Sequence, residues 1–155
     1  MNPAILTLKS SLSENDAHQM RLKKAIEGLT PDFPLSQEKF ITLSDSKIAL
    51  IDQLVYRFTK MQDSLGTRLI PSLFDLLEES DRPKPFLDIL NRLEQLELLE
   101  VESWQWFREL RNRIAHEYLD SLDQTISALN LLFESLPRFF QLYEVLKNEV
   151  LQRIP

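Results

Sequence analysis

Residues 51–69 read IDQLVYRFTKMQDSLGTRL, and this stretch gives the clearest indication of the fold class. Apolar side chains recur in it at intervals of three and four residues, which is the spacing of one face of an α-helix. They are Ile51, Leu54, Val55, Phe58, Leu65 and Leu69. Because Ser44 or Asp45 can cap its start, the pattern predicts a long helix from about residue 45 to 79. Pro71 lies inside that span and is expected to kink the helix or split it in two.

The composition extends this helical prediction to the whole chain. The 155 residues include only 2 glycines, fewer than the turns of a β-rich fold need, and the good helix formers Leu, Glu, Gln, Lys and Arg dominate. Apolar residues make up 43% and charged residues 27%, which is typical of a globular chain of single-domain length. We therefore predict an all-α fold, an up-and-down bundle of about five helices.

Turn signals divide the rest of the chain. A first helix is predicted over 3–28, with Gly28 as its stop signal. A Pro-containing connection over 29–43 follows, and its apolar side chains are expected to pack onto the bundle. We divide the chain into an N-terminal part, 1–43, and a helical bundle, 44–155.

The second half of the chain contains three further predicted helices. A break over 80–85 precedes a short helix over 86–98, and another helix is predicted over 102–118. Ser121 or Asp123 opens the last helix, which Pro137 should bend. This last helix carries much apolar surface, for which core packing is the first interpretation and a subunit contact the alternative.

Several classes of site and location are disfavoured by what the sequence lacks. With no cysteine and only two histidines, a thiolate metal site is excluded and no HExxH-type zinc site is present, so we expect no metal and no cofactor. No apolar stretch approaches the ~20 residues of a membrane span, and the first residues do not resemble an export signal, so we expect a cytoplasmic protein without a membrane partner. The net charge of −6 argues against broad, non-specific nucleic-acid binding but leaves room for a local basic pocket.

Such a basic pocket is predicted on the helix over 102–118. Arg108, Arg111 and Arg113 outnumber Glu109 within one and a half turns. Arginine suits phosphate because its planar fork donates two parallel hydrogen bonds. On a helical wheel, His116 points nearly opposite the apolar face, toward water or another subunit.

Histidine suits RNA cleavage because its ordinary pKa of roughly 6.5 lets it accept a 2′-hydroxyl proton near neutral pH. Asn112 lies one turn before His116 and shares its face. The alternative is that these Arg and His side chains only complement the helix dipole at its C-terminal end.

Residues 111–118, RNRIAHEY, contain the pattern R-x4-H-x-Y and resemble the HEPN proteins, in particular the HepT toxin group. The resemblance covers residues 108–118 in detail and about 45–150 in helix pattern. It implies a HEPN-like bundle and a metal-independent endoribonuclease toxin, of a type II or type VII-like pair, whose two motifs form one composite cleft in a homodimer. Arg111 would bind the scissile phosphate, His116 would act as general base or acid, and Asn112 would orient a catalytic group or the phosphate.

The same resemblance implies a partner, a minimal nucleotidyltransferase antitoxin that transfers AMP to Tyr118. AMP there would add negative charge and bulk beside Arg111, which gives the silencing a physical cause. The RNA substrate would be tRNA or mRNA. Two other functions stay open: a non-catalytic HEPN subunit that presents nucleotide or substrate to a nucleotidyltransferase, and a structural helical adaptor.

Several other side chains are candidates for contacts with RNA. Arg108 and Arg113 are candidates for phosphate binding, and Trp104, near the Arg111 side of the helix, could stack a base or simply pack. Arg57, Lys60 and Arg68 are interpreted as solvated charges, with an extended phosphate-binding surface as the alternative. His18 is expected at the surface.

Overall fold

Helices are the only regular elements in residues 2–78, 82–117 and 121–155, the parts of the chain that the computed structural model describes. This confirms the predicted all-α class. The α-helices are α1 Pro3–Leu29, α2 Gln37–Ile41, α3 Asp45–Ser64, α4 Ile70–Glu78, α5 Phe86–Gln95, α6 Val101–Glu117 and α7 Leu122–Arg153. A short 3-10 helix, η1 (Thr30–Asp32), follows α1, and a π-helical segment, η2 (Leu65–Leu69), joins α3 to α4.

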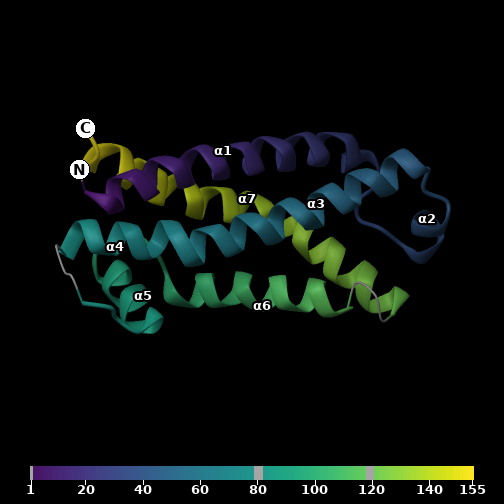
Figure 1. Ribbon diagram of the computed structural model, residues 1–155. Helices are drawn as coiled ribbons and strands as arrows, with labels where there is room; N and C mark the ends of the chain where they lie inside the picture. Colours follow the sequence, from purple (N-terminus) through teal and green to yellow (C-terminus); the bar gives the residue numbers. More distant parts are fainter. Residues whose placement is uncertain (1, 79–81, 118–120) are drawn as a thin grey trace.

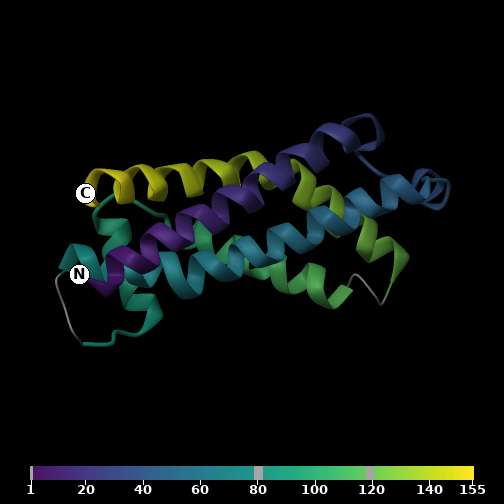
Figure 2. The same cartoon turned by 45° about the horizontal axis from the view of Figure 1, so that its top comes forward.

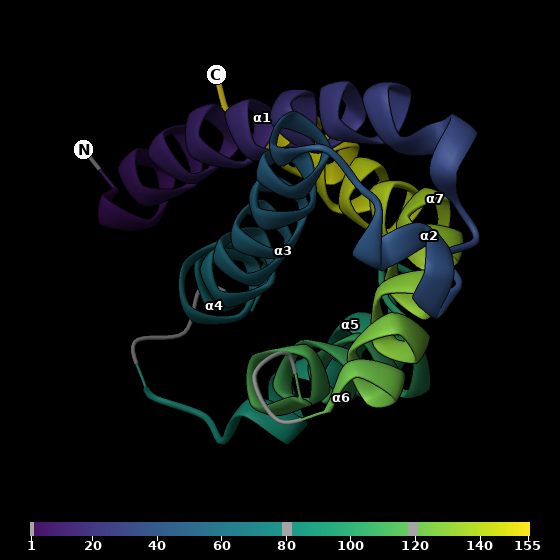
Figure 3. The ribbon, with the colours of Figure 1, turned by 90° about the vertical axis from the view of Figure 1, so that its right-hand side faces the viewer.

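Four long helical runs make up the bundle, and successive runs point in opposite directions (Figure 1). The runs are α1, the continuous α3–η2–α4, α6 and α7. Seen end-on, α1 lies across the top, and α3, α6 and α7 occupy the other sides (Figure 3). The four runs and the short α5 account for the five helices that the sequence predicts, whereas α2 was not predicted.

The hydrophobic core joins the long runs to one another. Its largest fully buried side chains are Trp104, Tyr143, Phe58, Phe107 and Phe139. Phe139 of α7 lies 5.0 Å from Phe58 of α3 and 5.1 Å from Phe107 of α6, measured between ring centroids. Aromatic pairs at this separation contribute about 0.5–1.5 kcal/mol beyond the area they bury. These contacts therefore fix α6 against α3 and α7.

The run through α3 and α4 passes Pro71 without ending there. Its α-helical hydrogen bonding changes one turn earlier, in η2, where the N–H of Ile70 bonds to the carbonyl of Leu65, five residues back. A proline has no N–H to donate, and its ring crowds the carbonyl four residues back. A π-turn is a way for a helix to absorb such a disturbance. The irregularity that we predicted at Pro71 thus lies in residues 65–69.

The face of α1 that packs on α3 is partly polar, which corrects one expectation. His18, predicted at the surface, is only 8% exposed. Its Nδ1 lies 3.1 Å from Nη1 of Arg57, and its Nε2 lies 3.5 Å from a carboxylate oxygen of Glu14. The fully buried Asn15 donates to Oγ of Ser64 at 3.1 Å. The polar middle of α1 packs against polar side chains of α3. Its polar residues are therefore buried, although their polarity suggested that they would be exposed.

The connection between α1 and α3 contains the short helices η1 and α2 and packs on α7. Ser36 caps α2, because its Oγ accepts from the backbone N–H of Lys39 at 3.1 Å. Phe33 stacks on Phe133 of α7 with ring centroids 4.1 Å apart. The amide of Asn130 accepts from the N–H of Leu35 at 2.7 Å and donates to its carbonyl at 2.9 Å.

Helix α5 ends at Gln95, earlier than the predicted residue 98. Glu97 adopts a positive φ of 60°, and its N–H bonds to the carbonyl of Glu94 at 2.9 Å. The next N–H, of Leu98, bonds to the carbonyl of Leu93 at 2.9 Å. This pair of bonds is the Schellman arrangement, which usually places glycine where Glu97 stands. The end of α5 was predicted too late because Glu97 occupies the position where glycine usually marks the end of a helix.

Caps predicted at two other helices are present. Oγ of Ser44 accepts from the N–H of Lys47 at 3.3 Å, and Oγ of Ser121 accepts from the N–H of Gln124 at 3.5 Å. Helix α7 continues through Pro137 and changes direction near its middle (Figure 2). The predicted end of α6 at Tyr118 lies outside the described residues.

Candidate functional site

Helix α6 presents its apolar face to the core and its polar face outward. The buried residues Trp104, Phe107, Leu110 and Ile114 follow at steps of three and four and are 1–3% exposed. This agrees with the helical wheel for the described residues. The exposed side of α6 includes Arg108, Asn112 and His116.

Arg111 lies at the edge between these two faces and is held by Asp63 of α3. Its Nε donates to one carboxylate oxygen of Asp63 and its Nη2 to the other, each at 3.0 Å. The Arg111 side chain is 28% exposed and that of Asp63 is 43% exposed. The Nε–Nη2 edge of the guanidinium is thus occupied, whereas the Nη1–Nη2 edge keeps donors for a second anion.

Asn112 also contacts this guanidinium. Its Oδ1 lies 3.4 Å from Nη1 of Arg111, a long hydrogen bond between neighbouring residues. Asp63 and Asn112 together fix the direction of the arginine fork. Asp63 was missed in the sequence, because the pair spans 48 positions and is visible only once α3 and α6 are side by side.

His116 is exposed in the last turn of α6. Five residues of helix place it roughly 7.5 Å along the axis from Arg111 and about 140° around it. Within one chain the structure brings Arg111 to Asp63 and Asn112, and ideal helix geometry sets His116 on another side of α6. Tyr118, the predicted modification site, lies outside the described residues.

The two arginines near Arg111, Arg108 and Arg113, lie on different sides of α6. Arg108 is exposed and lies on the side of α6 that carries Arg111 and Asn112, and all three line one hollow. Nη2 of Arg113 lies 3.3 Å from Oγ of Ser127 on α7, on the other flank. Of the two predicted phosphate contacts, Arg108 therefore shares a surface with Arg111, and Arg113 does not.

Trp104 packs in the core, so an exposed stacking platform is not what the structure shows. The side chain is 1% exposed, and its ring centroid lies 6.1 Å from that of Phe86. A Cβ added at Gly66 of η2 would stand 3.0 Å from Cζ2 of Trp104, which explains the small residue in η2. The packing alternative for Trp104 holds because its indole fills the space between α5, α6 and η2.

A groove runs along the outer side of α6 beside Arg111. One part is a hollow of about 380 Å³, and it is lined by Gln62, Asp63, Gly66, Thr67, Phe86, Trp104, Arg108, Arg111 and Asn112. A neighbouring hollow of about 510 Å³ shares Phe86, Trp104, Arg108 and Asn112 with it. We call the two together the α6 groove. Because η2 forms one wall, the groove lies at a π-helical segment, a feature that is frequent at functional sites.

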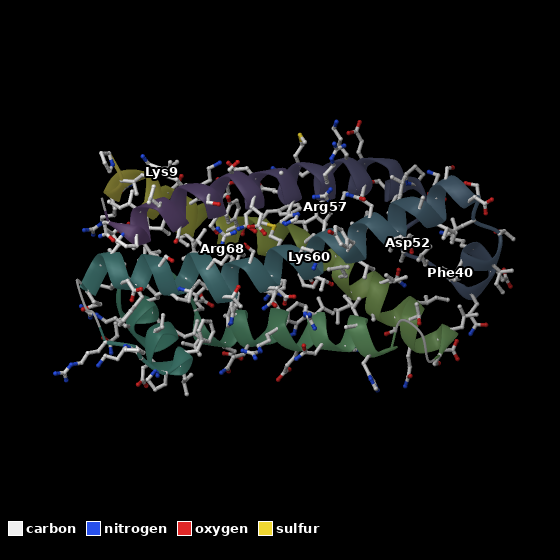
Figure 4. The ribbon with its side chains drawn as sticks, in the orientation of Figure 1. Lys9, Phe40, Asp52, Arg57, Lys60 and Arg68 are labelled. Atoms are coloured by element: carbon white, nitrogen blue, oxygen red, sulfur yellow. The ribbon has the colours of Figure 1, made fainter. Side chains whose placement is uncertain are left out.

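Arg57 of α3 and Arg68 of η2 do not extend this surface toward α6. Arg57 contacts His18, and Arg68 pairs with Glu14, so both point to α1 (Figure 4). The ammonium of Lys60 lies 5.8 Å from the ring centre of Tyr56 on the same helix.

The described residues contain neither a metal-binding cluster nor a membrane-spanning helix. No group of three or more His, Asp or Glu side chains in these ranges is placed to hold a metal ion. No described helix has the length and apolar character needed to cross a membrane. No protein-family model matches the chain, and no match is found among curated proteins or solved structures.

Proposed function

We propose that this protein is a metal-independent endoribonuclease in which Arg111 binds the scissile phosphate and His116 transfers protons. The observation that carries the proposal is the geometry of Arg111. Asp63 holds one edge of its guanidinium, and the other edge, which Asn112 meets only through a long contact at Nη1, keeps donors beside an open groove. A positioned fork of this kind is suited to an RNA phosphodiester.

The proposed reaction is an internal transesterification. The imidazole of His116 takes the proton of the ribose 2′-hydroxyl, and the 2′-oxygen attacks the phosphorus. The bond from phosphorus to the 5′-oxygen breaks, and that oxygen takes a proton from a second group. The products are a 2′,3′-cyclic phosphate and a 5′-hydroxyl, and no metal is needed because Arg111 stabilises the added negative charge.

A homodimer supplies the second proton-transferring group. One chain offers a single motif histidine, which is exposed and, by helix geometry, about 140° around α6 from Arg111. A two-fold axis near the exposed side of α6 would bring two copies of His116 and Arg111 to one cleft. We expect the specific activity to rise with protein concentration as dimers form, and a monomeric variant with full activity would refute the composite site.

The proposed partner is a nucleotidyltransferase antitoxin that silences the enzyme by transferring AMP to Tyr118. Support comes from the resemblance of residues 111–118 and from electrostatics. An added phosphate near the end of α6 would compete for the motif arginines.

Substitution tests the enzymatic proposal directly. We expect His116→Ala and Arg111→Ala each to lower RNA cleavage in a chelating buffer by at least about 100-fold. This is the usual size of a general acid–base contribution for His116 and of a lost electrostatic donor for Arg111. Arg92→Ala is the matched control, because Arg92 also pairs with a carboxylate, that of Glu78, but lies on α5. Equal loss in all three variants would indicate damage to the fold and contradict the assigned roles.

A non-catalytic nucleotide-binding subunit is the second candidate. The separation of Arg111 from His116 within one chain favours it, because binding a phosphate needs only Arg111. It predicts that His116→Ala leaves nucleotide affinity unchanged and that the wild-type protein cuts no RNA.

A further inference from the structure

Two residues that line the α6 groove each have a buried N–H group without an acceptor. Gln62 is 3% exposed and Trp104 is 1% exposed, and both line the hollow beside Arg111. Within the described residues, Nε2 of Gln62 and Nε1 of Trp104 have no hydrogen-bond partner. Buried donors are nearly always satisfied, and each unsatisfied one in a native structure calls for an explanation, such as a missing ligand or water.

The walls of the groove suit a flat ring. The half-buried ring of Phe86 on α5 gives the groove an aromatic side chain, and the buried indole of Trp104 lies behind it, with ring centroids 6.1 Å apart. Gly66 of η2 lies directly against the indole, because a Cβ there would stand 3.0 Å from Cζ2 of Trp104, and it adds no side chain to the groove. Hollows of about 380 and 510 Å³ are within the usual range for small-molecule sites.

The charge at the mouth of the groove suits a phosphate. In the hollow beside Arg111, Arg108 and Arg111 bring two positive charges against the one carboxylate of Asp63, whereas Glu109 lines only the neighbouring hollow. A ligand with an aromatic ring, acceptor atoms on that ring and an attached phosphate matches all of these features. Nucleotides combine the three properties.

We infer that the α6 groove binds the nucleobase of the nucleotide whose phosphate is held by Arg111, with the Gln62 amide donating to an acceptor on the base. This deepens the proposed ribonuclease function and rests on it for the identity of the substrate. It assigns base preference to Gln62 and to the η2 wall, and leaves proton transfer to His116. Gln62 is thus a binding residue, not a catalytic one.

Tryptophan emission can report on this groove. The chain has two tryptophans, and Trp106 packs elsewhere, against Phe107 and Arg138. In a Trp106→Phe background, Trp104 is the sole emitter. We expect nucleoside 5′-monophosphates to change its emission saturably. Ribose 5-phosphate, which lacks the base, should bind at least about tenfold more weakly.

Gln62→Met is the decisive variant, because it keeps the length of the side chain and removes the donor. Removing a buried unsatisfied amide should leave the fold at least as stable, so the melting temperature should hold or rise. Nucleotide affinity should fall about tenfold, the factor that corresponds to one hydrogen bond. Binding and stability therefore move in different directions, which a purely structural role for Gln62 does not predict.

Each outcome bears on one claim. Unchanged Trp104 emission at saturating nucleotide would overturn the base site, as would equal affinity for ribose 5-phosphate or undiminished affinity in Gln62→Met; the buried donors would then be water-bound only. If the protein binds nucleotides but does not cleave RNA, the ribonuclease proposal is refuted and the base site in the α6 groove stands. If RNA cleavage keeps its base preference in Gln62→Met, the ribonuclease proposal stands and the proposal that the α6 groove binds the base is refuted.

Discussion

Asp63 of α3 and Arg111 of α6 meet through two parallel hydrogen bonds of 3.0 Å, although 48 positions separate them in the chain. A bidentate pair of this kind fixes both the place and the plane of the guanidinium. It also sets the register of α6 on α3, so that the fork opens toward the α6 groove.

Asp63→Asn should weaken the hold on the Arg111 guanidinium while preserving the shape of the side chain at position 63. Because the pair is partly exposed, we expect a loss of less than about 1 kcal/mol in the free energy of unfolding. RNA cleavage should fall by about tenfold or more, since a misplaced Arg111 no longer meets the phosphate. Glu149→Gln, which loses the exposed pair with Arg153 on α7, is the control and should retain activity. Equal activity in both variants would remove Asp63 from the site.

More of the fold than of the candidate site could be predicted from the sequence. Apolar spacing and capping residues were enough for the long helices, as the Ser44 and Ser121 caps show. The π-helical η2 was not predictable, because Pro71 signals a disturbance without saying how many residues upstream it is absorbed. The burial of His18 was missed because it depends on Arg57, 39 positions away.

For the site, the wheel predicted correctly which side of α6 is buried. It could not supply Asp63, nor show that Arg113 turns toward α7 while Arg108 joins the groove. These are inter-helix relationships, and a helical wheel contains no information on the neighbouring helix. Trp104 was correctly given packing as its ordinary role, but its neighbours Phe86 and Gly66 come from other elements.

Stability should depend on pH through His18. Burial lowers the pKa of His18 below 6.5, and the neighbouring charges of Arg57 and Lys60 act in the same direction, while Glu14 opposes them. Below pH 6.5 the unfolded chain therefore binds the proton more readily than the folded one. The free energy of unfolding should fall as the pH drops from 6.5 to the folded-state pKa, and this contribution should level off below it.

His18→Gln removes the titrating group and should flatten that part of the pH profile. Urea unfolding of both proteins at pH 8, 6.5 and 5 measures the effect. A parallel pH dependence in wild type and variant would show that other groups are responsible.

Glu97→Gly should stabilise the protein. Glu97 has a φ of 60°, a conformation that costs a non-glycine residue roughly 1 kcal/mol. We expect a gain of about 0.5–1 kcal/mol in the free energy of unfolding. Asn91→Gly, in the exposed interior of α5, is the matched control and should lose a few tenths of a kcal/mol, about the difference in helix propensity. Losses in both variants would contradict the strain at Glu97.

Phe139→Ala should cost about 3–5 kcal/mol, a large share of the stability of a domain this size. The fully buried ring of Phe139 bridges Phe58 and Phe107, so its loss opens a cavity between α3, α6 and α7. Leu151→Ala on the same helix, where the side chain is 51% exposed, should cost far less. Thermal or urea unfolding measures both, and similar costs would place the core elsewhere.

The most direct test of the central claim is the chemistry of the cut ends. A labelled RNA is incubated with the purified protein in excess chelator, beside the same RNA with deoxyribose at the cleaved position. Attack by the 2′-oxygen with Arg111 and His116 predicts a 2′,3′-cyclic phosphate and a 5′-hydroxyl, and no cut in the deoxy substrate. A 3′-hydroxyl with a 5′-phosphate, cleavage of the deoxy position, or no cleavage at all would contradict it.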